Sequence, residues 1–160
     1  MIARPRPTPN DNLERAKEAA LRLLSYRARS EEELRRRLAQ KGYAAGTVRR
    51  VIAELRRVDL VNDRQFAESW VESRLAGRRA GRRGLLWELI RKGLDRDLAG
   101  EIVDRRLPPE AETVAAKALA DEFLAREGAE PKSLARLHRL LVRRGFSPAT
   151  VAEVLSRRQT

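Results

Sequence analysis

The stretch Leu34–Tyr43 reads LRRRLAQKGY, and its order of two leucines, a basic residue, a glycine and an apolar residue decides the fold. The same order returns at Leu85–Leu94 (LLWELIRKGL) and at Leu137–Phe146 (LHRLLVRRGF), with the glycines 51 and then 52 residues apart. Leucines four residues apart lie on one face of a helix, a basic residue suits the negative end of the helix dipole, and glycine adopts the left-handed conformation that ends helices. Each copy therefore predicts one helix with its stop signal.

Each copy lies between two further helical patterns. Apolar residues return six, nine and ten positions after each glycine, as Val48, Val51 and Ile52 do in the first copy, which is the buried stripe of an amphipathic helix. Another apolar stripe precedes each leucine pair, and in the middle copy it contains Phe66 and Trp70. The sequence therefore predicts three helices in each of three repeats.

Residues that start helices lie at the ends of these runs. Ser30 and Glu33 form a capping box. Asp63 and Asp95 are candidate N-caps, and Ser147 stands before a proline at the first helical position. No window alternates apolar and polar residues in the manner of a strand, and no hairpin signal lies between apolar runs. The sequence therefore predicts no sheet.

These patterns predict an all-α fold of three tandem three-helix repeats that form an elongated, curved array. The first eleven residues contain three prolines and few apolar side chains, so they cannot bury enough surface to order themselves. The predicted organisation is a flexible Pro/Arg-rich tail over residues 1–12, followed by repeats over residues 13–61, 62–107 and 108–160.

Composition argues against several classes of function. The chain has no cysteine, which excludes disulfides and thiolate metal sites. Its first residues lack the apolar core of a secretory signal, and no apolar run approaches the length that spans a bilayer, so we expect a cytoplasmic protein without membrane contact. His138 is the only histidine, and no nucleophile or metal ligand stands at a recognisable spacing from it. We expect a monomer with no catalytic residue, no metal, no cofactor and no enzymatic activity.

The charge of the chain favours a polyanionic partner. Its net charge is +12, and residues 1–61 carry 15 basic and 8 acidic side chains, against 11 and 8 in residues 62–107 and 9 and 7 in residues 108–160. In the first repeat, arginines seven residues apart share a helix face opposite the apolar stripe. In the second, Glu88 is the only acid in a run of basic residues from 74 to 92. The candidate polyanion-binding residues are Arg49, Arg50, Arg56, Arg57, Arg74, Arg78, Arg79, Arg82, Arg83, Arg91 and Lys92.

Each basic cluster also has a plain interpretation as a solvated surface. The segment Gly77–Gly84 is either a flexible joint or a mobile basic segment that follows a phosphate backbone or an acidic protein groove, and we favour the second. Its glycines match no nucleotide-binding fingerprint. Trp87 stands next to this run, where it either packs in the core or lies on the basic surface, and we favour the core.

Two stretches of the sequence carry a resemblance to a known family. The first, Ser30–Leu38 followed by Lys41, Gly42 and Tyr43, is similar to the first-repeat motif of the RecX family, the bacterial regulators of the RecA recombinase. The likeness covers residues 16–107 well and reaches residue 158 more weakly, although Gly84 and Trp87 stand where the family often has a basic and a polar residue. The second stretch, similar to the family's most recognisable segment, contains Asp59, Leu60, Val61, Asn62, Asp63, Phe66, Ala67, Arg74, Gly81, Glu88, Leu89, Lys92 and Gly93.

The resemblance implies three tandem three-helix repeats that bind the RecA nucleoprotein filament and reduce its strand-exchange, ATPase and coprotease activities. It implies no catalysis by this chain, and contact with single- and double-stranded DNA would be non-specific. A different interpretation is a non-specific DNA-binding protein built from helix-turn-helix-like units, with an affinity that comes from counterion release. A third is a purely structural helical scaffold.

Overall fold

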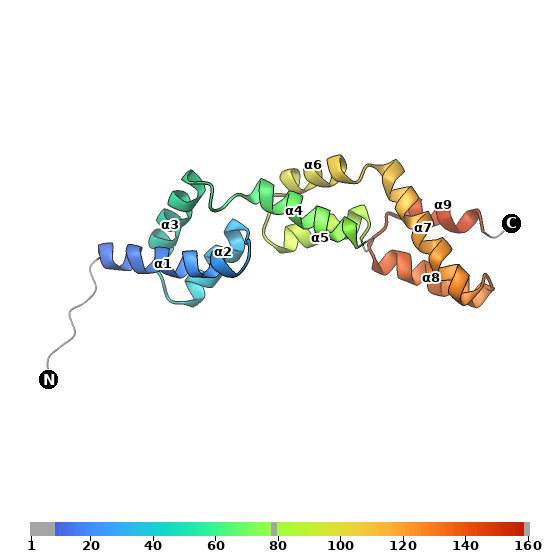
Figure 1. Ribbon diagram of the computed structural model, residues 1–160, viewed down its shortest axis with the longest axis horizontal. Helices are drawn as coiled ribbons and strands as arrows, with labels where there is room; N and C mark the ends of the chain where they lie inside the picture. The colour runs from blue at the N-terminus through green and yellow to red at the C-terminus, as the bar shows by residue number, and fades with distance from the viewer. Residues whose placement is uncertain (1–8, 78–79, 159–160) are drawn as a thin grey trace, which may run out of the picture. The chain divides into compact units, whose positions relative to one another are not determined.

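The computed structural model describes residues 9–77 and 80–158, and this part of the chain folds into nine α-helices with no strand (Figure 1). The prediction of an all-α fold of three tandem three-helix repeats is confirmed. The helices are α1 (Pro9–Tyr26), α2 (Glu31–Gln40) and α3 (Ala45–Arg57) in the first repeat, α4 (Asp63–Ala76), α5 (Arg82–Arg91) and α6 (Arg96–Arg106) in the second, and α7 (Pro109–Glu127), α8 (Pro131–Arg143) and α9 (Pro148–Ser156) in the third.

The described residues form two compact units. Unit 1 contains the described residues up to Phe66 together with Lys92–Leu94, and unit 2 contains Ala67–Arg91 and the described residues from Asp95 onward. Residues 1–8 of the predicted tail lie outside the described residues, and α1 begins at Pro9. The predicted repeat boundaries and the elongated, curved arrangement stay predictions.

In unit 1 the apolar stripes of α1, α2 and α3 meet in one core. The leucine pair of α2, Leu34 and Leu38, is fully buried, as are Val51 and Ile52 of α3. Each such side chain contributes about 1.5–3 kcal/mol when it leaves water. Ala16 of α1 is also fully buried, and its small side chain lets the helices approach closely. The spacing that predicts these helices therefore also supplies the core that holds them together.

Unit 2 contains the corresponding stripes of the second and third repeats. Leu85 and Leu89 of α5 are fully buried, and α5 packs against α6. Leu137 and Leu141 of α8 lie in a core cluster with residues of α7 and α9. Each leucine pair of the repeated motif is therefore part of a core, as predicted.

Three of the four predicted N-caps are confirmed. Ser30 and Glu33 form both hydrogen bonds of the capping box of α2. The carboxylate of Asp95 accepts two backbone N–H bonds at the start of α6, and the hydroxyl of Ser147 accepts one at the start of α9. A side-chain cap satisfies N–H groups that a helix cannot pair internally, and its loss costs about 1 kcal/mol.

The prediction that Asp63 caps its own helix is wrong. The side chain of Asn62 accepts the N–H of Gln65 at 3.0 Å and is therefore the cap of α4. Asp63 Oδ1 instead accepts the backbone N–H of Glu31, the first residue of α2, at 2.9 Å. Burial raises the pKa of Asp63 above its ordinary value, and the hydrogen bond from Glu31 offsets part of that rise. Asp63 therefore serves the helix start of the preceding repeat.

In both units, the start of a repeat's second helix contacts the glycine turn of the repeat that follows. In unit 1, Ser30 Oγ donates to the carbonyl oxygen of Lys92 at 2.5 Å. In unit 2, the N–H of Gly84 donates to the carbonyl oxygen of Gly145 at 3.0 Å. A Cβ on Gly145 would lie 2.3 Å from the Cα of Gly84, and Gly145 has a positive φ of 78°. The glycine that ends α8 is therefore also required for this backbone contact.

Candidate polyanion interface

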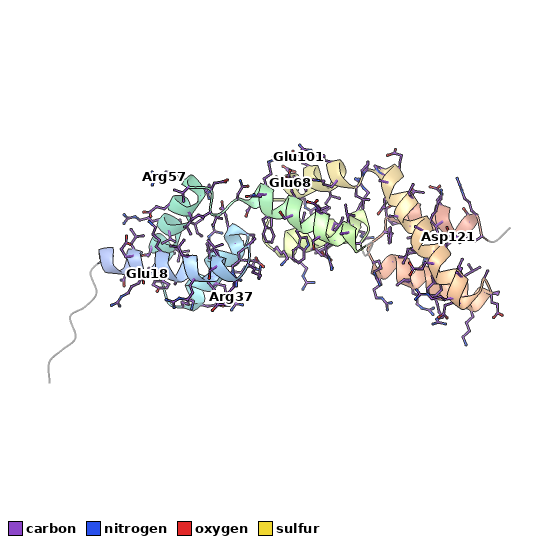
Figure 2. All side chains as sticks on the ribbon, viewed as in Figure 1. Glu18, Arg37, Arg57, Glu68, Glu101 and Asp121 are labelled. Carbon is purple, nitrogen blue, oxygen red and sulfur yellow. The ribbon has the colours of Figure 1, made fainter. Side chains whose placement is uncertain are left out.

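The exposed side of α3 carries arginines that have no acidic partner among the described residues. Val48, Val51, Ile52 and Leu55 bury the opposite side of this amphipathic helix in the core of unit 1. Arg49, Arg50 and Arg57 are exposed, and none of them makes an ion pair with a residue that the structure describes. Figure 2 shows the side chains, with Arg57 labelled at the C-terminal end of α3. This helix face therefore presents free positive charge.

The first turn of α3 adds backbone donors to this face. Ala44, the residue before the helix, makes no side-chain capping bond, so no side chain of the cap covers the first N–H groups of α3. Beside them, Arg49 and Arg50 line a hollow of about 560 Å³ together with Gly46, Thr47 and Ala53. A helix N-terminus attracts anions through its dipole and its unpaired N–H groups. The two arginines and the helix end thus act on the same side of α3.

Basic residues of α1 and of the α2–α3 turn extend this surface, and sequence reasoning missed them. Arg15 and Lys41 line a hollow of about 290 Å³ that shares Thr47 with the hollow on α3. Arg15, Lys41 and Arg22 line a further hollow of about 390 Å³, where Glu18 is the one acidic lining residue. Arg15 and Arg22 are seven residues apart, so they share one face of α1, as Arg50 and Arg57 share one face of α3. We call Arg15, Arg22, Lys41, Arg49, Arg50 and Arg57 the basic face of unit 1.

Arg56 does not share the free charge of its neighbours. Its Nε and Nη2 donate to the two carboxylate oxygens of Glu31 at 2.6 and 2.7 Å, in the bidentate geometry that suits a guanidinium. The hydrogen bond and the charge of Glu31 raise the pKa of Arg56 above its ordinary value. Arg56 joins α3 to the start of α2, so we leave it out of the set of residues with free positive charge.

The basic run from 74 to 92 forms internal bonds at several of its positions. Arg74 makes a bidentate pair with Glu88, and the same carboxylate accepts the indole N–H of Trp70 at 2.8 Å. The hydrogen bond that Arg74 donates to Glu88 raises the pKa of Arg74. The guanidinium carbon of Arg74 also lies 5.8 Å from the centre of the Trp70 ring, within the range of a cation–π contact. This cluster joins α4 to α5.

Arg82 links the second repeat to the third. Its guanidinium donates to the carbonyl oxygen of Leu107 at 2.6 Å and pairs with Asp104. Its backbone N–H donates to Glu112 Oε1 at 2.8 Å. The carboxylate of Glu112 is 1% exposed and also accepts bonds from Ser147 and Thr150. Glu112 on α7 therefore does for α5 what Asp63 on α4 does for α2.

Lys92 is also paired, at the contact within unit 1. Its ammonium lies 3.2 Å from Glu33 Oε1 and 5.8 Å from the centre of the Phe66 ring. Burial raises the pKa of Glu33, but the hydrogen bonds from Arg27 and Lys92 outweigh it and hold the value below the ordinary range. Lys92 therefore holds the glycine turn of the second repeat against the start of α2.

Two members of the run keep free charge. Arg83 and Arg91 are exposed and form no ion pair within residues 9–77 and 80–158. Arg78 and Arg79, which sequence analysis included among the candidates, lie outside the described residues. The candidate interface therefore keeps only the cations that form no ion pair among the described residues. The paired side chains hold helices together instead, and they are Arg56, Arg74, Arg82 and Lys92.

Trp87 lies on the surface, so the preference for the core is wrong. Its side chain is 57% exposed on α5, between the buried positions of Leu85 and Leu89. Trp70 is half-buried against Glu88. The helix period explains the difference, because Trp87 lies two residues from each buried leucine and a residue two positions away on a helix points to the opposite side.

The arginine pair Arg49 and Arg50 of α3 has no counterpart in the other repeats. The positions of Arg49 and Arg50, seven and eight residues after the repeated glycine, hold Gly100 and Glu101 in the second repeat. In the third repeat they hold Ala152 and Glu153. The apolar stripe is kept in all three repeats while the exposed face differs. The repeated fold therefore does not require Arg49 and Arg50. They belong to the surface of the first repeat alone.

Two kinds of site are absent from the described residues. Across residues 9–77 and 80–158, no three His, Cys, Asp or Glu side chains gather in a way that could hold a metal ion. Within the same ranges no helix has the length and apolar character needed to cross a membrane. His138 is exposed on α8.

Comparison with known proteins gives the family. The family model described as RecX, first three-helix domain, matches residues 16–55, and the one described as RecX, second three-helix domain, matches residues 62–101. The regulatory protein RecX of Mycolicibacterium smegmatis is 36% identical over 155 residues, which cover 92% of this chain and 81% of that protein. The regulatory protein RecX of Amycolatopsis mediterranei is 38% identical over 143 residues, which cover 86% and 79%.

A solved structure shares the fold. The crystal structure of RecX from Lactobacillus salivarius matches 94% of this chain and 98% of that chain with a TM-score of 0.82, at 22% sequence identity. The three-helix repeats of this protein are therefore found in an experimental structure as well. Since two domain models match in order and relatives of more than 30% identity match over most of both lengths, the chain belongs to the RecX family of regulatory proteins.

Proposed function

We propose that this protein binds the RecA nucleoprotein filament and negatively modulates its recombinase, ATPase and coprotease activities in DNA repair and the SOS response. It acts as a cytoplasmic monomer and by binding alone, with no reaction of its own. Membership of the RecX family supports a regulatory role. The observation that carries the proposal is the basic face of unit 1, whose arginine pair, Arg49 and Arg50, the other repeats lack.

The basic face suits a partner in which DNA phosphates and protein carboxylates lie side by side. Arg49, Arg50 and Arg57 offer guanidinium groups that bind either anion in a bidentate manner. They carry no internal partner among the described residues, so binding does not first have to break an ion pair. Bound cations release counterions from DNA, and the affinity then falls as salt rises. Occupancy of the filament surface by the folded repeats limits the cycling of its subunits.

Co-sedimentation with RecA filaments, compared with bare single-stranded DNA at the same salt concentration, tests the proposal. We expect the full-length protein to pellet with the filament and to inhibit strand exchange, and to bind the bare strand more weakly. Tight, steeply salt-dependent binding to bare DNA that added RecA leaves unchanged would contradict it. That result would assign the chain to the class of non-specific DNA-binding proteins.

The arrangement of α2 and α3 favours a second function, which is non-specific binding of DNA. Helices α2 and α3 follow each other across a short turn, and α3 presents Thr47, Arg49 and Arg50 in its first turns, where helix-turn-helix proteins read DNA. Duplex DNA is therefore included beside single-stranded DNA in the same assay. Preference for duplex over filament would support this second function.

A further inference from the structure

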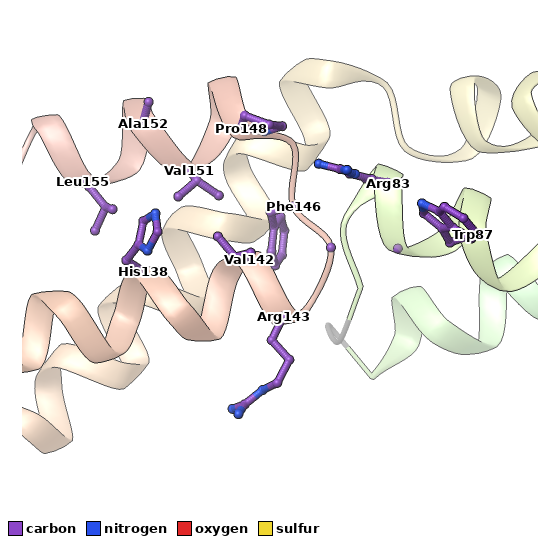
Figure 3. Close-up of a pocket in the computed structure, with 12 residues that line it drawn as sticks. Arg83, Trp87, His138, Val142, Arg143, Phe146, Pro148, Val151, Ala152 and Leu155 are labelled. Atoms are coloured by element: carbon purple, nitrogen blue, oxygen red, sulfur yellow. The ribbon is translucent and has the colours of Figure 1, made fainter.

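Unit 2 contains a concave apolar surface that the proposed function does not use. A cavity of about 490 Å³ lies where α5, α8 and α9 meet, and Figure 3 shows the side chains around it. Val142, Phe146, Val151 and Leu155 supply most of its apolar lining. Its volume is within the range of cavities that bind ligands in proteins.

The cavity continues along the third repeat. A neighbouring hollow of about 560 Å³ shares His138 and Leu155 with it and is also lined by Pro131 and Leu134. The two together form a groove between α8 and α9, longer than a single small molecule would need. We call this surface, with Trp87 at its edge, the α8–α9 groove.

Large apolar side chains are exposed at this groove, and no residue that the structure describes covers them. Trp87 is 57% exposed and Val142 is 54% exposed, and both line the cavity. An exposed tryptophan beside an apolar hollow is the residue type that most often dominates the energy of a protein interface. Water contact with these side chains is unfavourable, so a partner that covers them gains free energy.

The charges around the groove have one sign. Arg83 and Arg143 line the cavity, are exposed and make no ion pair within the described part of the chain. In Figure 3, Arg83 extends from α5 toward the loop that carries Phe146. Neither hollow has an Asp or Glu among its lining residues, and the one arginine that lines the second, Arg158, is paired with Asp121. The charge complement of this surface is therefore a carboxylate.

We propose that the α8–α9 groove binds an acidic segment of a partner protein, with an apolar side chain of that segment inserted next to Trp87 and Val142. Carboxylates of the segment lie against Arg83 and Arg143. The site is separate from the basic face of unit 1 and does not depend on the proposed contact with DNA. It gives the third repeat a binding role of its own.

The lining favours a protein segment over nucleic acid. Single-stranded nucleic acid binds by stacking successive bases on several aromatic side chains. Here the exposed rings are those of Trp87 and His138, since Phe146 is 3% exposed, and Val142, Val151 and Leu155 make the rest of the wall aliphatic. Aliphatic side chains accept a leucine, isoleucine or phenylalanine side chain and do not give successive bases a series of rings to stack on. The test must therefore distinguish binding of a peptide from binding of an oligonucleotide.

The test selects peptides on the full-length protein from a phage-displayed pool of twelve randomised residues. We expect the selected peptides to carry Asp or Glu beside one or two large apolar residues. A labelled synthetic copy is then titrated by fluorescence anisotropy against Val142→Glu and Trp87→Ala, and each change should weaken binding about tenfold or more. Val114→Glu is the matched control, because Val114 is 67% exposed on α7, does not line either hollow, and should leave the affinity unchanged.

Three further arms decide the chemistry. Replacing the acidic residues of the peptide by their amides should weaken binding, as should Arg83→Glu with Arg143→Glu. The variant reversed at Arg49, Arg50 and Arg57 should bind the peptide normally, so failure of the filament proposal and failure of this one give different results. The proposal is overturned if no acidic peptide is enriched, if Val142→Glu binds as tightly as the original chain, or if a fifteen-nucleotide thymidine strand binds and the groove variants weaken that binding instead.

Discussion

The exposed side of α3 and the run from 74 to 92 are both rich in arginine, but the structure uses them differently. On α3, Arg49, Arg50 and Arg57 point into solvent without an acidic partner among the described residues. In the run, Arg74 and Arg82 hold helices together through several hydrogen bonds each. Density of basic residues in a sequence is thus a poor measure of the charge that a surface offers.

Apart from Glu88, which lies within the run and pairs with Arg74, the acids that neutralise the run come from distant parts of the sequence. Asp104 is 22 residues from Arg82, and Glu33 is 59 residues from Lys92. On α3, by contrast, only Arg56 is paired, with Glu31, and the other arginines have no acidic partner among the described residues. Only unpaired cations can meet a phosphate without first losing an internal bond. The comparison therefore predicts that changes on α3 affect binding, and changes in the run affect stability.

The largest effect is expected at Glu112, the buried acid to which Arg82 donates its N–H. Glu112→Ala leaves several donors without a partner, and we expect it to lower the free energy of unfolding by about 3–4 kcal/mol. Thermal unfolding followed by tryptophan fluorescence measures this, since both tryptophans lie in unit 2. Glu110→Ala, on the exposed side of the same helix, is the control. Equal unfolding temperatures for the two variants would contradict the structural role of this carboxylate.

Next in size is the effect of reversing the free charge of α3. Arg49→Glu, Arg50→Glu and Arg57→Glu together should weaken filament binding about a hundredfold near 0.1 M salt, because three favourable contacts become repulsive. The dependence of the binding constant on salt should become shallower at the same time. Co-sedimentation over a series of salt concentrations measures both.

The charge-matched control reverses three exposed arginines outside the basic face, which also lack an ion pair in the described part of the chain. We expect it to retain most of the filament binding and to fold normally. A loss as large as that of the α3 variant would show that binding follows total charge and not this surface. The control positions are Arg96, Arg106 and Arg139.

A smaller effect is expected for Arg82, in the run. Arg82→Ala removes the bonds to Leu107 and Asp104 but keeps the backbone N–H that Glu112 accepts, and we expect a loss of about 1–2 kcal/mol in unfolding free energy. Filament binding at a temperature where the variant is folded should change less than threefold, about 0.6 kcal/mol. Circular dichroism and co-sedimentation measure the two quantities. Strong loss of filament binding without loss of stability would contradict the assignment of Arg82 to the packing of the repeats.

The smallest effect concerns Glu33, the acid that pairs with Lys92. Its folded-state pKa lies below its ordinary value, so the ionised carboxylate stabilises the folded state above the ordinary pKa of glutamate, and this contribution is lost as pH falls through the lowered pKa. Glu33→Gln should cost about 1 kcal/mol or less at pH 7 and almost nothing near pH 3. Chemical unfolding of both proteins at the two pH values measures the difference.

Asp63 serves as a comparison of opposite sign. Its pKa is raised by burial, so its contribution to stability declines as pH rises from its ordinary pKa through the raised one. Asp63→Asn should therefore make stability less sensitive to pH in the direction opposite to Glu33→Gln. The same sign for both variants would contradict the assignment of the two carboxylates.

Much of the fold follows from short-range patterns. The leucine pairs, the basic residue of the last turn and the glycines of the repeated motif are spaced by a few residues, and the helices begin and end close to where these signals stand. Trp87 shows a local pattern that was misjudged, because its distance of two residues from Leu85 and Leu89 already indicates the exposed side. Asp63 shows one that local spacing could not decide, since the N–H it accepts lies 32 residues away.

The candidate site was predicted in part. Arg49, Arg50 and Arg57 were found from the sequence, because an exposed face follows from the position of the apolar stripe. Arg15 and Lys41 were missed, because they belong to different elements and only the packing of α1 against the α2–α3 turn brings them to one hollow. The α8–α9 groove was missed for the same reason.

The sequence by itself determined the helices, their repetition and the identity of the buried leucines, because these depend on periodicity within one helix and on caps a few residues away. The tertiary structure alone decided which cations are free and which apolar side chains stay exposed. Pairing of Arg82 with Asp104, or exposure of Val142 beside Trp87, depends on helices that are far apart in the chain and close in space. Electrostatic and apolar contacts act over a few ångströms whatever the sequence separation, so a count of charges along the chain does not reveal them.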